Sequence, residues 1–576
     1  MIAMTRKTLD RNVALGRGLI AFAVLSFFIA ALTVPYFNLQ PGYTDAFYHY
    51  NGAKRLAAGD GFIEDYLWTY QGAPRSLPAP SHLYWMPGTS ILASLGMRLF
   101  GPSYAAAQVA LVLCVWGAAL VAYGLGLTMG GTGRHAWAAG LLTLSGGFFL
   151  RMYGVTDTFA PYALFGAAAL VAQGWARASG RLRPWAIAGA LAALGHLIRS
   201  DGLLLVIVGM GAALWPTQIF QMINQGRARA THESPLQMDQ GRAAHISPQN
   251  ETMDQGRARA RYIVPLQKRM GYAAVFLLAY IVVMSPWFVR NLAAVGTILP
   301  TGGTQAVWYL TYDDLFNYPP VPDPTAFTSA GLQRLLQARI DVFTPTLQNF
   351  IAVEGMIVLV PLMLIALWRR RRQPLYQPFM VFVIGIHLAF WWAFPYPGVR
   401  GGLFHASAAL IPWWAALGVT GIDDVVQWIA RHRKHWNPRT ASRLFTLMLL
   451  LGVAWLSWTI SVPRRVPSYV LPLYPALEAA LPAGARVMIN DPSQLYYYTG
   501  RGGVALPNAA PQTILDVAAV YDIRYLVIEG DGVNGYAVPV PMTFDADHPP
   551  AFLREVSHDQ FQLGEARLYE IVRETP

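Results

Sequence analysis

Charged residues are scarce in this chain. Asp, Glu, Lys and Arg make up 13% of its 576 residues, whereas a soluble domain usually carries about 25%. Cysteine is scarcer still, because Cys114 is the only one and lies inside an apolar run. A single thiol excludes a disulfide within the chain and a structural zinc site built from several thiolates. The composition therefore argues against a soluble, disulfide-bonded or zinc-thiolate protein.

Hydrophobic residues are abundant, at 54% of the chain. Many of them occur in runs near 20 residues long, which is the length that crosses a bilayer core of about 30 Å as a helix. The first run is long for a signal peptide and lacks a convincing cleavage site, so we expect a retained anchor. We predict an α-helical polytopic membrane protein of about 11 spans, at 15–37, 105–129, 136–150, 158–176, 184–198, 202–222, 271–289, 349–368, 374–397, 401–424 and 444–463.

Basic residues indicate which span ends face the cytoplasm. If the N-terminus lies inside, the even-numbered spans end in the cytoplasm, and those ends carry Arg and Lys at 134, 177–183, 369–372 and 431–439. This pattern follows the positive-inside rule, and it explains the net charge of +12 without a nucleic-acid partner. It requires residues 86–101 to form a helix at the outer interface instead of a span. The C-terminus is then outside.

Two segments differ from the spans in composition. Residues 223–270 contain the near-copies "QGRARA", "QGRAAH" and "QGRARA", and their polarity indicates a low-complexity cytoplasmic insertion. Residues 464–576 read as a small soluble α/β domain. Its strand, helix and strand are expected at 485–491, 513–523 and 524–531. We therefore divide the chain into a transmembrane domain, 1–463, with a first outer loop at 38–104, and an extracytoplasmic domain, 464–576.

The outer turns carry charged side chains at span ends. Asp45 begins the first outer loop, and Asp157 follows the third span. The basic candidates on the same side are Arg151, Arg199, Arg290, Arg400 and His82. The spans 136–150 and 184–198 are short, and 15 helical residues cover only about 22 Å of a core of about 30 Å. The turns after them should lie below the membrane surface, where irregular backbone must line a cavity.

Such a cavity would suit an anionic ligand. An Arg at membrane depth costs at least about 2.5 kcal/mol, and guanidinium groups match phosphate oxygens. One of Asp45 and Asp157 could then act as a general base, and together they could hold a divalent metal ion or orient a sugar. Simpler explanations stay open, because an Arg can snorkel to the headgroups and Asp157 can be a helix N-cap. Glu354, near the outer end of its span, either faces the cavity or pairs with an Arg.

The outer segments occur in a definite order: "TDAFYHYNGAKRLAAGDGF", "HLYWMPGTSILASLGMRLFG", "RMYGVTDTFAPY", "LGHLIRSDGLLL" and "SPWFVRNLAAVGTILPTGG". In this order and outward placement they resemble the GT-C superfamily of integral membrane glycosyltransferases. The most similar groups are the protein O-mannosyltransferases and the aminoarabinose lipid A transferases. The likeness covers about residues 1–425 and depends on the set of segments, since no single motif is decisive.

The resemblance implies a glycosyltransferase of the inner membrane with its active site outside. It would move a hexosyl or pentosyl group from a polyprenyl-phosphate donor to a hydroxyl of a lipid, glycan or protein, with inversion if the displacement is direct. The implied essential acid is Asp45, with Asp157 as the second acid. The implied donor-phosphate contacts are Arg151, Arg199, Arg290, Arg400 and His82.

The sequence departs from the family pattern in the first outer loop. "TDAF" replaces the frequent Asp-Glu pair after Thr, and "SHLYWMPG", with His82, replaces the usual basic residue. The alternative function is a multi-spanning transporter of an anionic or lipid-linked substrate, which would also have outer charges and broken helices. The chain shows no repeated halves, which disfavours the transporter.

Overall fold

The computed structural model describes residues 6–72, 74–216, 264–300, 302, 305–320, 324–433, 435–529, 548–557, 559–564 and 566–573. Most of the predicted insertion at 223–270 and the end of the predicted span 202–222 lie outside the described residues. So does the end of the strand expected at 524–531.

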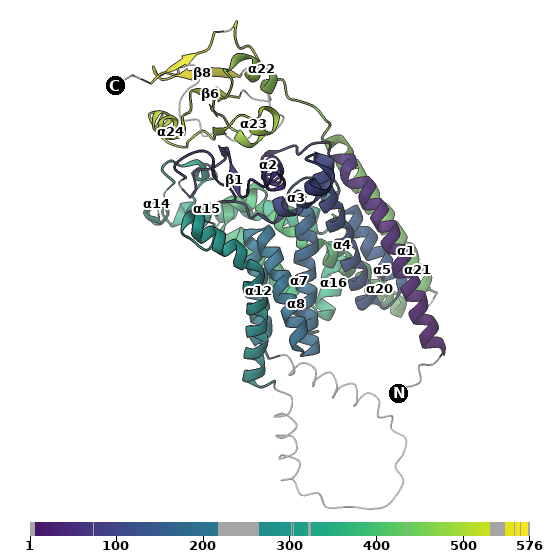
Figure 1. Cartoon of the computed structure of the whole chain (residues 1–576). Helices are drawn as coiled ribbons and strands as arrows, with labels where there is room; N and C mark the ends of the chain where they lie inside the picture. The colour runs from purple at the N-terminus through teal and green to yellow at the C-terminus, as the bar shows by residue number, and fades with distance from the viewer. Residues whose placement is uncertain are drawn as a thin grey trace, which may run out of the picture.

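A bundle of helices forms the larger part of the molecule (Figure 1). Its main members are α1 (Arg6–Phe37), α4 (Tyr104–Gly130), α5 (Gly133–Ser145), α7 (Phe159–Ser179), α8 (Leu182–Ile198), α9 (Leu203–Leu214), α12 (Leu266–Val295), α16 (Val360–Arg370), α17 (Gln377–Leu388), α20 (Ile411–His432) and α21 (Pro438–Ser461). Within the described ranges, six helices are long and apolar enough to cross a membrane, and three apolar helices are shorter. The chain is thus a polytopic membrane protein, while the number of 11 spans stays a prediction.

Two predicted spans are interrupted. The segment 136–150 stops being helical at Ser145, where Gly146 and Gly147 both have positive φ, and a short helix, α6 (Phe149–Met152), follows. The segment 349–368 begins as a π-helix, η4 (Asn349–Glu354), and resumes as α16 only after a turn. Hydropathy did not reveal these breaks, because glycine and apolar turn residues keep the average hydropathy of the run high.

Small residues let the helices of the bundle approach closely. A Cβ added at Gly189 would lie 2.1 Å from the carbonyl oxygen of Phe276, where α8 packs on α12. At Gly421 it would lie 2.1 Å from the carbonyl oxygen of Leu362, where α20 packs on α16. Such small-residue contacts are typical of helices that associate in a bilayer.

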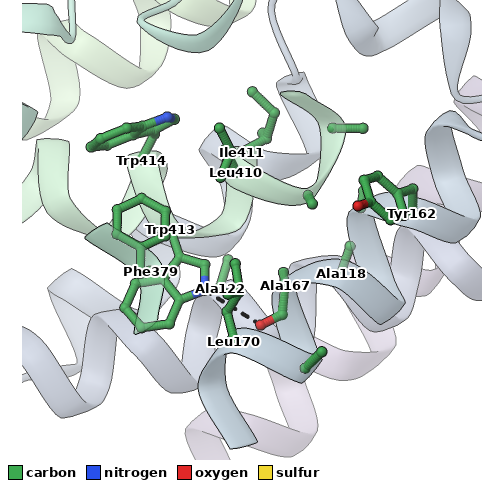
Figure 2. Close-up of a cluster of buried hydrophobic side chains, with 14 of the residues drawn as sticks. Ala118, Ala122, Tyr162, Ala167, Leu170, Phe379, Leu410, Ile411, Trp413 and Trp414 are labelled. Carbon is green, nitrogen blue, oxygen red and sulfur yellow. Dashed lines mark hydrogen bonds between the residues drawn. The ribbon is translucent and has the colours of Figure 1, made fainter. Parts of the chain in front are cut away.

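Large aromatic side chains fill the space between α20, α17 and α7 (Figure 2). Trp413 stacks on Phe379 with ring centroids 4.6 Å apart, and its Nε1 donates to the carbonyl oxygen of Ala167 at 3.3 Å. All three residues are buried. This core fixes α20, whose preceding segment, 403–410, contributes to the site described below.

The C-terminal part folds as an α/β domain at the end of the bundle opposite the N-terminus (Figure 1). Its sheet has the order β2-β5-β4-β6-β8-β7. The strands are β2 (Tyr66–Leu67), β4 (Val487–Met488), β5 (Gly503–Val504), β6 (Tyr525–Ile528), β7 (Leu553–Glu555) and β8 (Arg567–Ile571), and the helices are α22 (Leu473–Ala480), α23 (Pro492–Thr499) and α24 (Thr513–Tyr521). The expected strand–helix–strand pattern therefore corresponds to β4, α24 and β6.

One strand of this sheet comes from the first outer loop. β2 pairs in parallel with β5, so that Tyr66 lies opposite Gly503. The same loop also forms α2 (Thr44–Ala58), a small pair of strands, β1 (Ile63–Glu64) and β3 (Ala79–Pro80), and α3 (Gly88–Phe100), which matches the helix expected at 86–101. The loop is therefore part of both predicted domains.

The α2 helix is attached directly to the C-terminal domain. The Thr44 hydroxyl donates to Asp491 Oδ2 at 2.6 Å, and Asn51 Nδ2 donates to the carbonyl oxygen of Ser493 at 2.8 Å. Phe47 and Tyr497 pack with ring centroids 4.9 Å apart. These contacts hold in place the helix that carries Asp45.

Candidate active site

The turn 151–158 docks against α1 and α4 through its own backbone. The Arg151 carbonyl accepts from Asn38 Nδ2 at 2.5 Å, and the Gly154 carbonyl accepts from Gln108 Nε2 at 2.8 Å. A Cβ at Gly154 would lie 2.1 Å from the carbonyl oxygen of Val34, so only glycine permits this approach. The docked turn places the Asp157 side chain in the interior of the protein.

Asp157 is fully engaged by hydrogen-bond donors. Its Oδ2 accepts from the Tyr43 hydroxyl at 2.5 Å and lies 2.8 Å from His405 Nε2. Its Oδ1 accepts from the backbone N–H of Thr158 at 2.5 Å, which is not the N2 or N3 contact of a helix N-cap. Asp157 therefore does not cap α7, and its Oδ2 faces Tyr43 and His405 instead.

Asp45 lies next to this pair. One ligand atom each from Asp45, Asp157 and His405 lies within 4.8 Å of the others, and we call these residues the Asp–Asp–His cluster. Unlike Asp157, Asp45 has no side-chain hydrogen bond to a residue within the described ranges. The two acids predicted from the sequence thus share one site, and one of them is free to accept a proton.

The surroundings shift the pKa values of Asp45 and Asp157 in opposite directions. Burial raises the pKa of Asp45 to about 7, and the nearby charge of Asp157 acts in the same direction. Burial would also raise the pKa of Asp157, but the charge of His405 and the hydrogen bonds from His405 and Tyr43 outweigh it and hold that pKa below its usual value. Such a separation is typical of paired acids with different roles, and a carboxyl group that titrates near 7 suits a general base.

Arg199 supplies positive charge beside the cluster. Its guanidinium pairs with both oxygens of Asp201, at 2.6 Å from Nη2 to Oδ2 and 3.0 Å from Nε to Oδ1. It also donates to Thr158 Oγ1 at 3.2 Å and to the carbonyl oxygen of Gly402 at 3.1 Å. Since Thr158 follows Asp157 and Gly402 precedes His405, these bonds tie the arginine to both sides of the site.

The other basic candidates are placed differently. Arg290 donates to the carbonyl oxygens of Phe62 and Ser81 at 3.0 and 2.7 Å, so it holds the first outer loop. His82 is fully buried and lies within hydrogen-bond distance of Ser90. These contacts join both residues to the first outer loop and not to the side chains of Asp45, Asp157 or His405, and a phosphate-binding role for either residue stays a prediction.

Arg151 and Arg400 complete the predicted set. Arg151 is partly exposed and donates through Nη1 to the carbonyl oxygen of Arg464 at 2.9 Å. It lies near Tyr43, since its charge lowers the pKa of that hydroxyl against the larger effect of burial, which raises it. The side chain of Arg400 lies outside the described residues.

His405 and Tyr43 were not predicted from the sequence. His405 lies in the apolar run 401–424, and an ionisable residue inside a predicted span is by default a functional-site candidate. That signal was present and would have identified it. Tyr43 had no comparable signal, because one tyrosine among the many of the outer loop is ordinary.

The Asp–Asp–His cluster fits a divalent metal ion by its chemistry. Carboxylate oxygens suit Mg²⁺ and Mn²⁺, and an imidazole nitrogen with carboxylates also suits Zn²⁺. The Asp45 carboxylate lacks a hydrogen-bond partner among the described side chains, so its oxygens are available as ligand atoms. Asp45, Asp157 and His405 are the residues that would hold such an ion.

Glu64, also in the first outer loop, is a buried acid outside the cluster, only 9% exposed. Burial raises its pKa to about 8, and the Tyr48 hydroxyl and the Arg290 charge act in the opposite direction. Tyr66 also faces this carboxyl group. The folded protein therefore holds a proton on Glu64 that the unfolded chain releases at lower pH.

This proton makes the stability of the protein pH-dependent. Because the pKa of Glu64 is higher in the folded state, the free energy of unfolding should fall as pH rises from about 5 to 8, by up to about 1.4 kcal/mol per pH unit. Glu64→Gln cannot ionise, so its melting temperature relative to that of the wild type should be higher at pH 8.5 than at pH 5.5. Melting curves of both proteins in detergent at the two pH values provide the test, and equal shifts at both pH values would contradict it.

Comparison with known proteins identifies the fold. No protein-family model matches the chain, and no curated protein matches its sequence. The oligosaccharyltransferase AglB from Archaeoglobus fulgidus, in complex with an inhibitory peptide and a dolichol-phosphate, superimposes with a TM-score of 0.51 at 13% identity, over 88% of this chain and 69% of that chain. ArnT from Cupriavidus metallidurans in the apo state gives 0.50 at 13% identity, over 97% and 98%. These similarities confirm the predicted GT-C resemblance at the level of the fold.

Proposed function

We propose that this protein is a membrane glycosyltransferase, which moves a sugar from a polyprenyl-phosphate donor to a hydroxyl acceptor on the outer face of the inner membrane. The observation that carries the proposal is the Asp–Asp–His cluster beside Arg199, whose Asp45 lies on α2, the helix bonded to the C-terminal domain. The AglB structure of similar fold holds a dolichol-phosphate, which supports a lipid-phosphate donor.

Asp45 is the proposed general base. It accepts the proton of the acceptor hydroxyl while that oxygen forms a bond to the anomeric carbon of the sugar. The bond between the anomeric carbon and the phosphate oxygen breaks, and polyprenyl phosphate leaves with the electron pair. No strong general acid is required, because phosphate is already a good leaving group.

The contacts of Asp157 favour inversion. A retaining mechanism needs a second carboxylate free to attack the sugar. Asp157 instead accepts hydrogen bonds from Tyr43 and the Thr158 backbone and contacts His405. These contacts lower its nucleophilicity, so a direct displacement with Asp45 as base is the better fit.

Charge on the leaving phosphate must also be stabilised. Arg199 is oriented in advance by Asp201, Thr158 and Gly402, so its positive field needs no rearrangement during the reaction. Arg151, partly exposed and close to Tyr43, is the proposed second phosphate contact.

We also propose that Asp45, Asp157 and His405 hold one divalent metal ion. When bound, the ion would supply further positive charge for the developing phosphate charge. Protein dialysed against EDTA should lose at least about 100-fold in turnover and regain it with Mg²⁺ or Mn²⁺. Metal content per chain should be close to one in the wild type and near zero in Asp157→Asn. Full turnover by protein whose measured metal content is zero would contradict a metal requirement.

The function is tested with purified protein in lipid nanodiscs, labelled polyprenyl-phosphate sugars and a bacterial lipid extract as the source of acceptor. Release of polyprenyl phosphate together with label in an acceptor product is the expected result. If solute moves across a proteoliposome membrane and no donor is consumed, the protein is a transporter and the proposal is wrong.

A further inference from the structure

The α15 helix (Leu332–Gln348) lies at the end of the bundle nearer the C-terminal domain and runs obliquely to α12 (Figure 1). It carries three charged side chains along its length, at Arg334, Arg339 and Asp341. Charges at these positions oppose burial of the whole helix in the hydrocarbon core of a membrane. The exposure of its side chains indicates where the helix lies instead.

The exposed side chains of α15 fall into two separate sectors. The apolar ones, between 42% and 71% exposed, are Leu332, Leu336, Ile340, Phe343 and Leu347. At 3.6 residues per turn they lie within an arc of about 80°. The exposed polar ones are Gln333, Arg334, Gln337, Asp341, Thr344 and Gln348, and they occupy the next arc of about 100°. The remaining sector contains Ala338 and Val342 and is buried against the protein.

This division into three sectors is typical of a helix in a membrane interface. A helix on the surface of a soluble protein needs a buried sector and a polar sector only. A helix that is surrounded by lipid would have no exposed polar sector. An apolar sector and a polar sector side by side are both satisfied where acyl chains meet water, because each sector then faces the phase that suits it.

The apolar sector of α15 continues a lipid-facing stripe of the bundle. Gln377–Ala393 is one of the shorter apolar helices, and its exposed residues Ile384, Leu388 and Trp392 are spaced by four, so they share one face. Trp392, at the end of this stripe, lies beside α15, because its carbonyl oxygen accepts from Arg339 Nε at 3.2 Å. The lipid that covers this stripe therefore also reaches α15.

The opposite side of α15 holds the segment that leads to His405. Three consecutive short elements pack on α15: η5 (Ala389–Ala393), α18 (Pro395–Pro397) and η6 (Gly398–Gly402). Trp391 Nε1 donates to the carbonyl oxygen of Arg339 at 2.9 Å, and the rings of Trp391 and Phe343 have centroids 5.5 Å apart. The last of these elements ends three residues before His405, so the position of α15 bears on the Asp–Asp–His cluster.

We propose that the apolar sector of α15 inserts among the acyl chains of the leaflet on the side of the C-terminal domain, with its polar sector at the level of the headgroups. The membrane thereby holds residues 389–402 in place and, through them, His405. The insertion itself is independent of the reaction, whereas its effect on His405 rests on the proposed glycosyl transfer. The continuity with the lipid-facing stripe favours lipid over a second copy of the chain as the cover.

Spin labels at two neighbouring residues measure the insertion. Leu336 and Gln337 lie at nearly the same height along α15 but in different sectors. Cys114 is the one cysteine of the chain, so Leu336→Cys and Gln337→Cys are made in a Cys114→Ala background. In nanodiscs of phosphatidylethanolamine and phosphatidylglycerol, oxygen, which concentrates among acyl chains, should relax the label at residue 336 more than a water-soluble nickel chelate does. The order should be reversed at residue 337.

Two outcomes would refute the insertion. Equal relaxation of both labels by the nickel chelate would place both sectors in water. Shielding of the label at residue 336 from both reagents, with spin–spin coupling between chains, would show that a second copy covers the apolar sector. Neither measurement depends on turnover.

Ile340→Glu tests the link to the site, with Gln337→Glu as the matched control. The first variant places a carboxylate in the apolar sector, and the second places the same group in the polar sector. A charge among acyl chains is costly, so Ile340→Glu should lift α15 and make the label at residue 336 accessible to the nickel chelate. The displaced segment should lower kcat by up to about 100-fold, while the control keeps the kcat of the wild type.

The combined results separate this inference from the proposed function. Full activity of an Ile340→Glu protein whose α15 has left the lipid would contradict the link to His405. If the wild type transfers sugar while both labels lie in water, the inference is wrong and the proposed function stands. If the labels show insertion while the wild type transfers no sugar, the insertion stands and the proposed function is wrong.

Discussion

Asp45→Asn should abolish glycosyl transfer without unfolding the protein. Asparagine has the shape of aspartate but cannot accept the proton of the acceptor hydroxyl, and general-base catalysis is worth about 10²- to 10⁴-fold in rate. The Asp45 side chain makes no hydrogen bond to a described residue that the amide would break. The substitution also removes the repulsion between Asp45 and Asp157 that helps to raise the pKa of Asp45. The melting temperature of the protein without metal should therefore be unchanged or higher, and kcat should fall by at least about 100-fold.

The control for this experiment is Asp60→Asn. Asp60 is an exposed acid in the same outer loop and pairs with Arg55 at 2.9 Å. Surface ion pairs contribute little, about 0–1 kcal/mol, so this variant should keep both its activity and its melting temperature. An active Asp45→Asn enzyme would show that another group accepts the proton, and the mechanism proposed above would then have to be abandoned.

Replacing Glu354 should have the largest effect on stability. This acid is fully buried at the end of η4. It accepts hydrogen bonds from Ser407 Oγ and Trp414 Nε1, each at 2.9 Å, and its Oε1 lies 3.1 Å from His387 Nε2. The structure thus resolves the earlier alternatives for Glu354, because it pairs with a histidine and not with an arginine. Breaking a buried ion pair by removing one partner costs about 3–5 kcal/mol.

Glu354→Leu should therefore lower the free energy of unfolding by about 3–5 kcal/mol, because it leaves the buried Trp414 donor and the half-buried His387 without a partner. Glu354→Gln can keep part of the hydrogen bonding and should cost less. Ser407 follows His405 by two residues, so the leucine variant should also lower activity by displacing His405. Denaturation curves in detergent measure the effect. The control is Glu478→Leu, on the exposed side of α22, whose stability should stay within about 0.5 kcal/mol of the wild type. Equal stability of the Glu354→Leu protein and the wild type would contradict this role.

The prediction from sequence was most successful where the signal is local. Long apolar runs identified the helices that are long enough to cross a membrane, because span length follows directly from bilayer thickness. The turns that carry Asp45 and Asp157 were noticed because few charged residues occur near apolar runs. Arg199 was found in the same way, and the structure ties it to both sides of the cluster.

The prediction was weaker where a residue's role depends on partners. Arg290 and Arg199 look alike in the sequence, since each is an arginine at a span end, yet Arg290 is bonded to the backbone of the first outer loop. His405 was passed over inside an apolar run although it contacts Asp157. The division into two domains also missed β2, which crosses from the first outer loop into the C-terminal sheet.

The sequence by itself determined that this is a multi-spanning membrane protein with acids and arginines in the turns at span ends, because hydropathy and charge are properties of each segment alone. Only the tertiary structure decided that Asp157 and His405, 248 residues apart, meet beside Asp45. The physical reason is that the residues of a short segment do not specify which distant segments it will contact. The distances between such residues are set when the glycine contacts, the aromatic core and the C-terminal sheet pack the helices against one another.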